Sequence, residues 1–263
     1  MGQWAQVLGC LLEVVFPERC LLCGAEPHEA RWVVRGRTVT GLRPWDGPHL
    51  CRICGDGLGA GIVTGRVGFG TGTDLPVIAA VATNPELVKL VGQFKYHGVR
   101  GLAWPLAGML TVPLSAALGA WGPVAALVPV ALHRRRRRIR GFNQAEILAR
   151  LAAASRQVPV RTDILFRHRN TEQQAKLSTT EKRRGNLSAA FSARGESGPV
   201  NPAGAPPARV VLVDDLVTSG CTAMAAAQSL QSAGWEVIGV LALGLAAKDD
   251  NNGPPVDTWE AGF

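Results

Sequence analysis

Short apolar runs alternate with amphipathic stretches along most of the chain. Four of these runs, at 77–81, 124–132, 210–213 and 235–243, are rich in valine, leucine and alanine. Continuous apolar runs of this length are typical of strands buried in a parallel sheet. Helical patterns lie between them, so the order of apolar and polar positions predicts an α/β fold with a mostly parallel sheet flanked by helices.

The helix that follows the first strand has the clearest start signals. Asn84 supplies an N-cap, Pro85 takes the first helical position and Glu86 places an acid in the first turn. The residues predicted to share its apolar face are Leu87, Val88, Val91 and Phe94. Further helical patterns cover 101–118, where Pro105 and Pro113 interrupt them, 141–155, and the alanine-rich stretch 223–233.

The segments outside these elements suggest how the chain divides. The glycine-rich stretch 55–72 predicts a linker, and residues 4–15 show the pattern of an amphipathic helix. Glycine and proline at 195–207 predict a flexible excursion, and the polar end predicts a poorly ordered tail. We therefore predict an N-terminal helix and cysteine module at 1–60, a main domain at 74–247 and a tail at 248–263.

Two acids and a turn of small residues follow the run at 210–213. Asp214 and Asp215 come first, and the turn consists of Thr218, Ser219, Gly220, Cys221 and Thr222. Free backbone N–H groups at the start of a helix, together with its positive end, form a cradle for a phosphate. The acids can accept hydrogen bonds from a sugar attached to that phosphate, or hold a cation such as Mg²⁺. The alternative is an ordinary strand–helix turn with a solvated acid pair.

Two cysteine pairs near the N-terminus have the spacing of a metal site. Cys20 and Cys23, and then Cys51 and Cys54, are each separated by two residues and followed by glycine. Four thiolates at this spacing favour a structural, tetrahedral Zn²⁺ ion with no open position for catalysis. Two disulfides and four unrelated thiols are the alternatives, and a cytoplasmic setting disfavours disulfides. Other candidates are less suitable: His28 and His49 lie between the pairs as substitutes, and Cys10 and Cys221 are not expected to be ligands.

The positive charge of the chain is concentrated in one place. The formal net charge is +8, and six arginines lie between Arg134 and Arg140. This run follows a predicted strand, so we expect a loop at the ligand edge of the sheet, where Arg134 and one neighbour could contact a diphosphate. Contact with nucleic-acid phosphates and a plain solvated face are the alternatives. No aromatic residue interrupts the run, so base stacking is not predicted.

The sequence also gives an expectation for the compartment. We expect no apolar run to reach the roughly 20 residues that a membrane-spanning helix needs. The N-terminal helical pattern lacks a basic leader and a long apolar block, which argues against a signal peptide. We therefore expect a cytoplasmic protein, and a weak contact of this helix with a membrane surface is the alternative.

The stretch from Val210 to Thr222 resembles the motif of type I phosphoribosyltransferases that binds 5-phosphoribosyl 1-diphosphate (PRPP). The shared order is four apolar residues, two acids, two apolar residues and a turn of Thr, Ser and Gly. The resemblance implies a type I phosphoribosyltransferase-like fold in which Asp214 and Asp215 contact the ribose hydroxyls of PRPP, bound with Mg²⁺. It also implies that Thr218 to Thr222 hold the 5-phosphate. Cys221 departs from the motif, although its backbone N–H can still serve.

Other motifs make the resemblance more specific. They are Phe94-Lys-Tyr-His-Gly98, Val128-Pro-Val, His133-Arg-Arg-Arg, Arg140-Gly-Phe-Asn-Gln144, Thr171 with Gln174, Arg183 with Asn186, and Phe191. Together with the four cysteines they resemble the ComF family, relatives of phosphoribosyltransferases linked to competence and DNA uptake, over about residues 16–243. This resemblance implies a role with incoming single-stranded DNA and with competence proteins. By the phosphoribosyltransferase layout, 162–191 would be a mobile loop that closes over the substrate.

The sequence leaves the choice between two functions open. A PRPP-dependent pentosyl transferase would use the acids, the turn and the arginines, but no general base stands out and the acceptor is not indicated. A PRPP-sensing or DNA-binding adaptor without turnover would use the same pocket as a sensor. A purely structural zinc protein would leave the order of the acids and the turn unexplained. The oligomeric state is likewise open.

Overall fold

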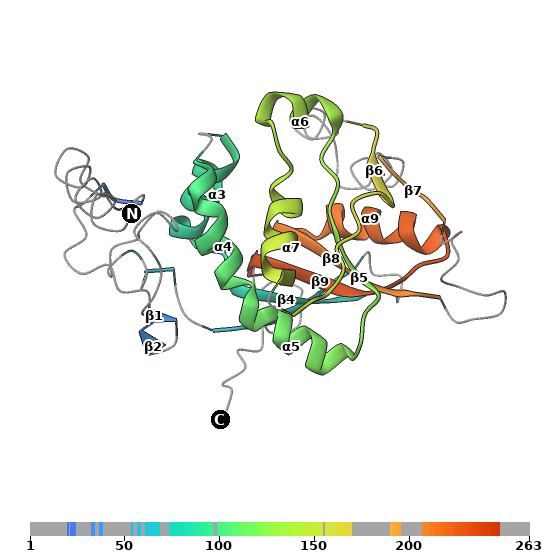
Figure 1. Ribbon diagram of the computed structural model, residues 1–263, viewed down its shortest axis with the longest axis horizontal. Coiled ribbons are helices and arrows are strands. Elements are labelled where there is room, and N and C mark those ends of the chain that lie inside the picture. Colours follow the sequence, from blue (N-terminus) through green and yellow to red (C-terminus); the bar gives the residue numbers. More distant parts are fainter. Residues whose placement is uncertain are drawn as a thin grey trace, which may run out of the picture.

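A five-stranded sheet lies at the centre of the protein (Figure 1). The computed structural model describes residues 20, 22–24, 33–34, 37–38, 54, 57–58, 61–68, 74–96, 99–154, 156–169, 190–195 and 207–247. The predictions for the N-terminal helix, Cys10, Cys51, His28, His49 and the tail lie outside the described residues. So do residues 170–189 of the loop predicted at 162–191 and residues 196–206 of the excursion predicted at 195–207. Outside the central sheet, β1 (Val33–Val34) and β2 (Arg37–Thr38) form a short antiparallel pair.

The central sheet has the strand order β3-β4-β9-β8-β5. The parallel strands are β4 (Leu75–Ala82), β9 (Glu236–Leu245), β8 (Arg209–Val217) and β5 (Ala126–Pro129). All four predicted strands are therefore present, although β5 is shorter than predicted and β8 is longer. The predicted fold class, an α/β fold with a mostly parallel sheet, is confirmed.

Strand β3 (Val63–Val67) runs antiparallel to β4 and lies inside the predicted linker. The linker prediction was therefore wrong over this part, and the sheet begins before residue 74. Gly65 contributed to the linker prediction, but here the glycine allows close packing within the sheet. A Cβ atom at this position would lie 2.8 Å from a methyl carbon of Leu245. The proposed division into domains stays a prediction.

Helix α3 (Pro85–Tyr96) begins as the sequence predicts. The Asn84 side-chain oxygen accepts a hydrogen bond from the backbone N–H of Leu87 at 2.8 Å, which is the geometry of an N-cap. The buried stripe consists of Leu87, Leu90, Val91 and Phe94. Val88 was assigned to this face wrongly, since its side chain is 48% exposed.

The apolar segment after α3 forms the short turn η1 (Arg100–Leu102), α4 (Ala103–Met109) and α5 (Thr111–Trp121). The break falls at Leu110, and both prolines lie in the first turn of a helix, where no N–H donor is lost. By length and composition, Ala103–Trp121 would pass as a membrane span, which corrects the expectation that no run is long enough. Leu106, Leu110 and Leu114 are buried in the protein core, as in a core helix.

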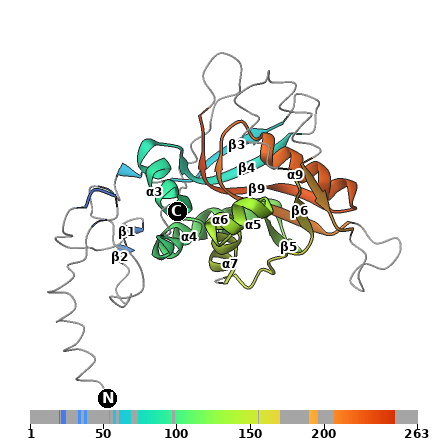
Figure 2. The same ribbon diagram turned by 90° about the horizontal axis from the view of Figure 1, so that it is seen from above.

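The helices cover both faces of the sheet (Figure 2). Helices α3, α4 and α5 lie on one face together with α7 (Gln144–Ala154), over a core that includes Phe94, Leu127 and Leu148. Helix α9 (Cys221–Ser232) lies on the other face, next to β6 (Leu165–Arg167) and β7 (Phe191–Ala193), which pair antiparallel. Each layer contains a helix that follows one of the two neighbouring strands: α7 comes after β5, and α9 comes after β8. The candidate site lies at the ends of these two strands.

Strand β5 is an outer strand of the sheet, and its free side is partly occupied by the chain itself. The backbone N–H of Leu127 donates to the Pro159 carbonyl at 2.8 Å, and the N–H of Arg161 donates to the Leu127 carbonyl at 2.9 Å. A parallel bridge between Leu127 and Val160 results. Beyond β5 the backbone N–H of Val130 still donates to the Val213 carbonyl, which keeps the ends of β5 and β8 together.

Candidate functional site

Asp214 and Asp215 lie inside strand β8, not after it as the sequence suggested. Pairing with β9 continues past them, through Asp214 with Ala242 and Leu216 with Gly244. The strand therefore carries both carboxylates into the edge of the core. Asp214 is half-buried, and Asp215 is only 3% exposed.

Asp215 has one well-bonded oxygen and one without a partner. Its Oδ1 accepts from Lys95 Nζ at 2.8 Å and from the backbone N–H of Leu216 at 2.7 Å. Its Oδ2 is buried and has no hydrogen-bond partner within the described part of the chain. A buried carboxylate oxygen is normally satisfied by a donor or a cation, so the open oxygen indicates room for a ligand.

Asp214 has a perturbed acidity. Burial raises the pKa of Asp214 to about 7, and the negative charge of Asp215 adds to the shift. The positive charges of Lys95 and Arg167 and the N–H of Asp215 oppose it. Its Oδ1 accepts from that N–H at 2.9 Å. Two neighbouring carboxylates of this kind attract a cation or a hydroxyl donor.

The turn after β8 leads directly into α9. Thr218 and Ser219 are exposed, and Gly220 is buried in the left-handed region at φ 71°. The N-cap residue Gly220 has no side chain to cap α9, and no side-chain oxygen from the described part of the chain bonds to the first N–H groups of this helix. Cys221 and Thr222 form the first turn of α9. The arrangement agrees with the predicted anion cradle, although the roles of the individual residues stay predictions.

Gly220 is required for the shape of this turn. A Cβ atom added there would lie 2.4 Å from Cβ of Val67 in strand β3. The φ angle of 71° is also one that residues with a side chain rarely adopt. Strand β3 therefore packs against the base of the turn and fixes its position.

The arginine run forms helix α6 (Arg134–Arg140), which corrects the prediction of a loop. His133 caps the helix: its Nδ1 accepts a hydrogen bond from the backbone N–H of Arg135 at 3.2 Å. Gly141, in the left-handed conformation, ends the helix. Arg134 is exposed and forms no ion pair with Asp214 or Asp215 among the described residues. The helix lies at the same edge of the sheet as the acids, because it follows β5.

Several arginines of α6 have partners of their own. Arg137 contacts Glu146 at 3.5 Å, and Arg140 bonds to Gln144. The Arg140 guanidinium also lies 5.1 Å from the ring centroid of Tyr96, which is 70% exposed. An aromatic side chain therefore lies beside the run in space, although none interrupts it in the sequence. Because Tyr96 is in α3, its distance along the chain concealed it.

Two cations near the acids were not singled out from the sequence as site residues. Lys95 belongs to the last turn of α3, and Arg167 ends β6 with its guanidinium 5.2 Å from the ring centroid of Phe191. Arg167 is 9% exposed, and its charge reaches Asp214. Lys95 stands in the Phe-Lys-Tyr-His-Gly motif, which was the available signal. No comparable motif pointed to Arg167, which lies within the segment predicted to be a loop and ends strand β6 in the structure.

The cysteine cluster is brought together as predicted for the three described members. The Sγ atoms of Cys20, Cys23 and Cys54 all lie within 4.8 Å of one another. The backbone N–H of Gly24 donates to the Cys20 carbonyl at 2.7 Å, with Gly24 at φ 76°, which is the tight turn expected of a metal knuckle. Three converging thiols fit a soft divalent cation such as Zn²⁺. Cys51 lies outside the described residues.

The cysteine module is attached to α3. Lys89 Nζ donates to the Leu22 carbonyl at 2.5 Å, and the Asn84 side-chain amide donates to the Leu58 carbonyl at 3.0 Å. Cys20, Leu22 and Leu58 are also buried in the core cluster that contains α3. The helix that supplies Lys95 to the acids thus also carries the module.

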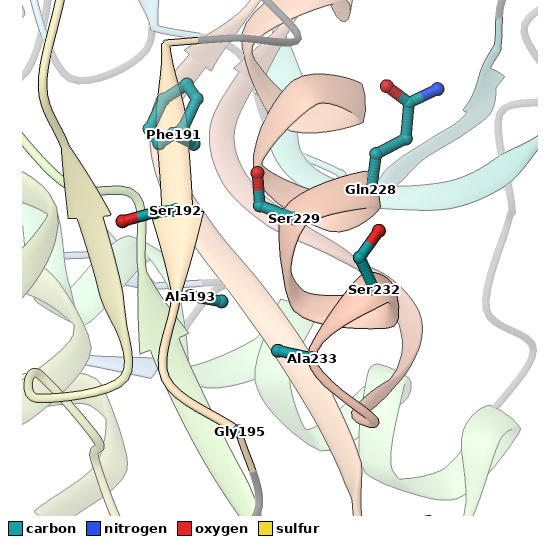
Figure 3. Close-up of a pocket in the computed structure, with 8 residues that line it drawn as sticks. All are labelled: Phe191, Ser192, Ala193, Gly195, Gln228, Ser229, Ser232 and Ala233. Atoms are coloured by element: carbon teal, nitrogen blue, oxygen red, sulfur yellow. The ribbon is translucent and has the colours of Figure 1, made fainter.

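A cavity of about 670 Å³ lies elsewhere, between β7 and the second half of α9 (Figure 3). Its lining includes Ser192 on β7 and Gln228, Ser229 and Ser232 on α9, with no ionisable side chain. It lies at the opposite half of α9 from the turn at Gly220. The acids and the turn therefore form a site that is distinct from this cavity.

Comparisons with known proteins agree with the sequence resemblance. No family model matches the chain. Over 121 residues the chain is 35% identical to Competence protein F of Haemophilus influenzae, which covers 46% of this chain and 50% of that protein. The chain thus matches about half the length of that relative.

Solved structures with some likeness are two phosphoribosyltransferases and a UMP synthase. Adenine phosphoribosyltransferase from Leishmania donovani is 14% identical, with a TM-score of 0.32 over 57% of this chain and 72% of that one. Orotate phosphoribosyltransferase from Aeropyrum pernix is 16% identical, with a TM-score of 0.28 over 71% and 76%. Leishmania donovani UMP synthase is 17% identical, with a TM-score of 0.30 over 68% and 27%. The resemblance to the ComF family is confirmed by the match to Competence protein F, over the residues which that match covers.

Proposed function

We propose that the end of β8 binds PRPP together with Mg²⁺. The observation that carries the proposal is the buried carboxylate of Asp215, which has one oxygen without a hydrogen-bond partner among the described residues. It lies shortly before a turn into α9, whose N-cap residue Gly220 makes no side-chain cap. Asp214 and Asp215 would accept hydrogen bonds from the ribose hydroxyls of PRPP, and the backbone N–H groups from Thr218 to Thr222 would hold its 5-phosphate. Oxygen ligands of this kind suit Mg²⁺.

The charges around the acids also suit a diphosphate. Lys95 and Arg167 approach the acid pair from different elements, and Arg134 begins a helix at the same edge of the sheet. Transfer of a phosphoribosyl group would place negative charge on the departing diphosphate, which cations stabilise. No described side chain stands out as a general base, so turnover is a separate question. Release of diphosphate from PRPP, with and without single-stranded DNA, would separate a transferase from a sensor.

Thermal unfolding with PRPP and Mg²⁺ tests the binding proposal. A ligand of the folded state at about 100 times its Kd adds ~2.7 kcal/mol, or roughly 5–10 °C in Tm for a domain of this size. The double variant Asp214→Asn, Asp215→Asn should lose the shift while staying folded. Glu236→Gln is the matched control, because this acid lies at the start of β9, at the other end of the sheet. An undiminished shift in the double variant would remove the acids from the site.

We also propose that the cysteine cluster holds one structural Zn²⁺ ion, with Cys51 as the fourth ligand. The support is the convergence of Cys20, Cys23 and Cys54 around the Gly24 turn. Elemental analysis should find about one zinc per chain, by the usual four-ligand stoichiometry. The Cys51→Ala, Cys54→Ala variant should lose it and Cys221→Ala should keep it. Full zinc content in the double variant would contradict the assignment.

A second candidate function is the handling of single-stranded DNA in competence. It is supported by the name of the matched relative, Competence protein F, and by the exposed arginines of α6 beside Tyr96. Arginines neutralise phosphates, and an exposed aromatic ring offers a surface on which a base can stack. The two functions are compatible, since a PRPP pocket could regulate a DNA-binding surface. Competence proteins as partners and a cytoplasmic location belong to the same proposal.

A further inference from the structure

Lys95 and Asp215 form an ion pair that links α3 to the candidate site. The two residues are 120 positions apart in the chain, and Nζ lies 2.8 Å from Oδ1. Lys95 stands in the last turn of α3, where the negative end of the helix favours a cation. Its side chain is 19% exposed, against 4% for Asp215. The side chain of Lys95 is therefore more accessible to solvent than the side chain of Asp215.

The two acids face different layers of the protein. Asp215 forms its ion pair with Lys95 on the face covered by α3. Asp214 forms no such pair among the described residues, although the charges of Lys95 and, more weakly, of Arg167 in the layer of β6 and β7 both reach it. Successive residues of a strand point to opposite faces, which produces this separation. Asp215 is thus the acid with a built-in counter-ion.

The contacts of Asp215 leave one position open. Lys95 and the N–H of Leu216 both bond to Oδ1, whereas Oδ2 is buried with no hydrogen-bond partner among the described residues. A buried carboxylate tolerates this poorly, and a cation that reached both oxygens would satisfy it better than the ammonium group does.

We propose that Lys95 is a positioning residue that competes with a divalent cation for the Asp215 carboxylate. In the ligand-free protein it neutralises Asp215 and holds the carboxylate in place. When a divalent cation binds the Asp215 carboxylate, it replaces the ammonium group of Lys95 there. The ammonium group then moves toward solvent and the bound anion. The proposal rests on the function proposed above, because the cation would arrive with PRPP.

Binding of Mn²⁺ alone, followed by electron paramagnetic resonance without PRPP, tests the competition. The titration is done at a pH well above the pKa of about 7 of Asp214, so that this acid is ionised. Lys95→Gln should bind Mn²⁺ about tenfold more tightly than the wild type, since a unit charge next to a divalent ion is removed. Lys95→Arg should restore the wild-type affinity. Lys89→Gln removes the same charge from the same helix, at the contact with the cysteine module, and should leave the Mn²⁺ affinity unchanged.

A lysine with a purely structural role gives different results. It would make Lys95→Gln bind Mn²⁺ equally or more weakly, and either outcome overturns the proposal. Absence of Mn²⁺ binding in both proteins also overturns it. The PRPP thermal shift of the wild type is measured in parallel. If that shift is absent while Lys95→Gln binds Mn²⁺ more tightly, the PRPP function fails and the role of Lys95 stands.

A second measurement uses the wild-type protein and does not depend on how the variants fold. Acylation of lysines by an amine-reactive reagent is followed by mass spectrometry with and without Mg²⁺. Release from Asp215 should raise the labelling rate of Lys95 several-fold, because a paired ammonium group reacts slowly, and leave Lys89 unchanged. An unchanged rate at Lys95 in saturating Mg²⁺ would show that the cation does not displace it.

Discussion

Strands β5 and β8 are neighbours that end at the same edge of the sheet, and the residues at their ends carry opposite charges. The acids and the arginines differ in how far they are buried. The acids at the end of β8 are drawn into the strand, where Asp215 is 3% exposed. The arginines after β5 form a helix in which no residue is buried. The acid end is thus a small, enclosed arrangement, and the arginine end is an open surface.

The difference follows from what each segment can pack. Apolar residues of β8 lie on both sides of Asp214 and Asp215. The turn that follows passes close to the side chain of Val67, which is possible because Gly220 has no side chain. Six long cations cannot share such a space, because each needs water or an acidic partner. A helix capped by His133 presents them to solvent with few contacts. We therefore expect changes at the acid end to alter stability and changes at the arginine end to alter binding alone.

The largest effect on stability is expected at Gly220. Gly220→Ala places a side chain at φ 71° and a Cβ atom 2.4 Å from Val67. Left-handed strain and the forced shift should together cost about 3 kcal/mol in the free energy of unfolding. Urea unfolding measures this cost.

Gly92→Ala is the matched control for this change. Gly92 lies within α3, and a Cβ atom there would meet no atom within 4 Å. Because alanine favours a helix more than glycine does, the control should gain roughly 0.5–1 kcal/mol. Equal effects of the two substitutions would mean that the turn at Gly220 is not held by β3.

A smaller effect is expected at Asp214, and it should depend on pH. An acid whose pKa rises from 3.8 to about 7 on folding binds more protons in the folded than in the unfolded protein between these values. Stability should therefore fall as the pH rises through this window and stay reduced above it. Since Asp214 is only half-buried, we expect the loss to be about 2 kcal/mol, less than the full shift implies.

Asp214→Asn removes the titration and keeps the oxygen that accepts the Asp215 N–H. It should be more stable than the wild type above pH 7 and similar to it near pH 4, because the stability lost through Asp214 develops only as the pH rises from 3.8 toward 7. Chemical unfolding at both pH values checks this. A stability difference that is the same at both pH values would show that ionisation of Asp214 is not its cause.

The smallest effect on stability is expected for α6. Arg134, Arg135 and Arg138 are exposed, so Arg→Gln at all three should change the free energy of unfolding by less than about 0.5 kcal/mol. If α6 binds single-stranded DNA, the triple variant should bind more weakly, and its log–log salt slope should flatten by roughly 2, at ~0.7 for each phosphate contact. Fluorescence anisotropy at several salt concentrations measures both. Equal affinity and slope in wild type and variant would place DNA binding elsewhere.

Local patterns in the sequence predicted the sheet and much of the acid end. The apolar runs identified the four parallel strands, and Asn84 with Pro85 identified the start of α3. The Cys-Leu-Leu-Cys-Gly spacing predicted a cluster that the three described thiols form. In each case, residues close together in the chain carry the signal.

The errors concern contacts between distant segments. Lys95 reaches Asp215 across 120 positions, and Tyr96 at the end of α3 meets Arg140 at the end of α6. Gly65 was read as a linker residue because its reason for being small, the side chain of Leu245, lies in another strand. A single sequence contains no local pattern that indicates such pairs.

The outer side of β5 has a consequence for how the protein behaves among other chains. A sheet edge with free N–H and C=O groups can pair with a strand of another molecule and start aggregation. Here both backbone groups of Leu127 are already bonded, to Pro159 and Arg161, and Pro129 has no N–H to offer. The strand is also only four residues long. The protein therefore closes this edge with its own chain, and intermolecular strand pairing at β5 would first have to break two internal hydrogen bonds.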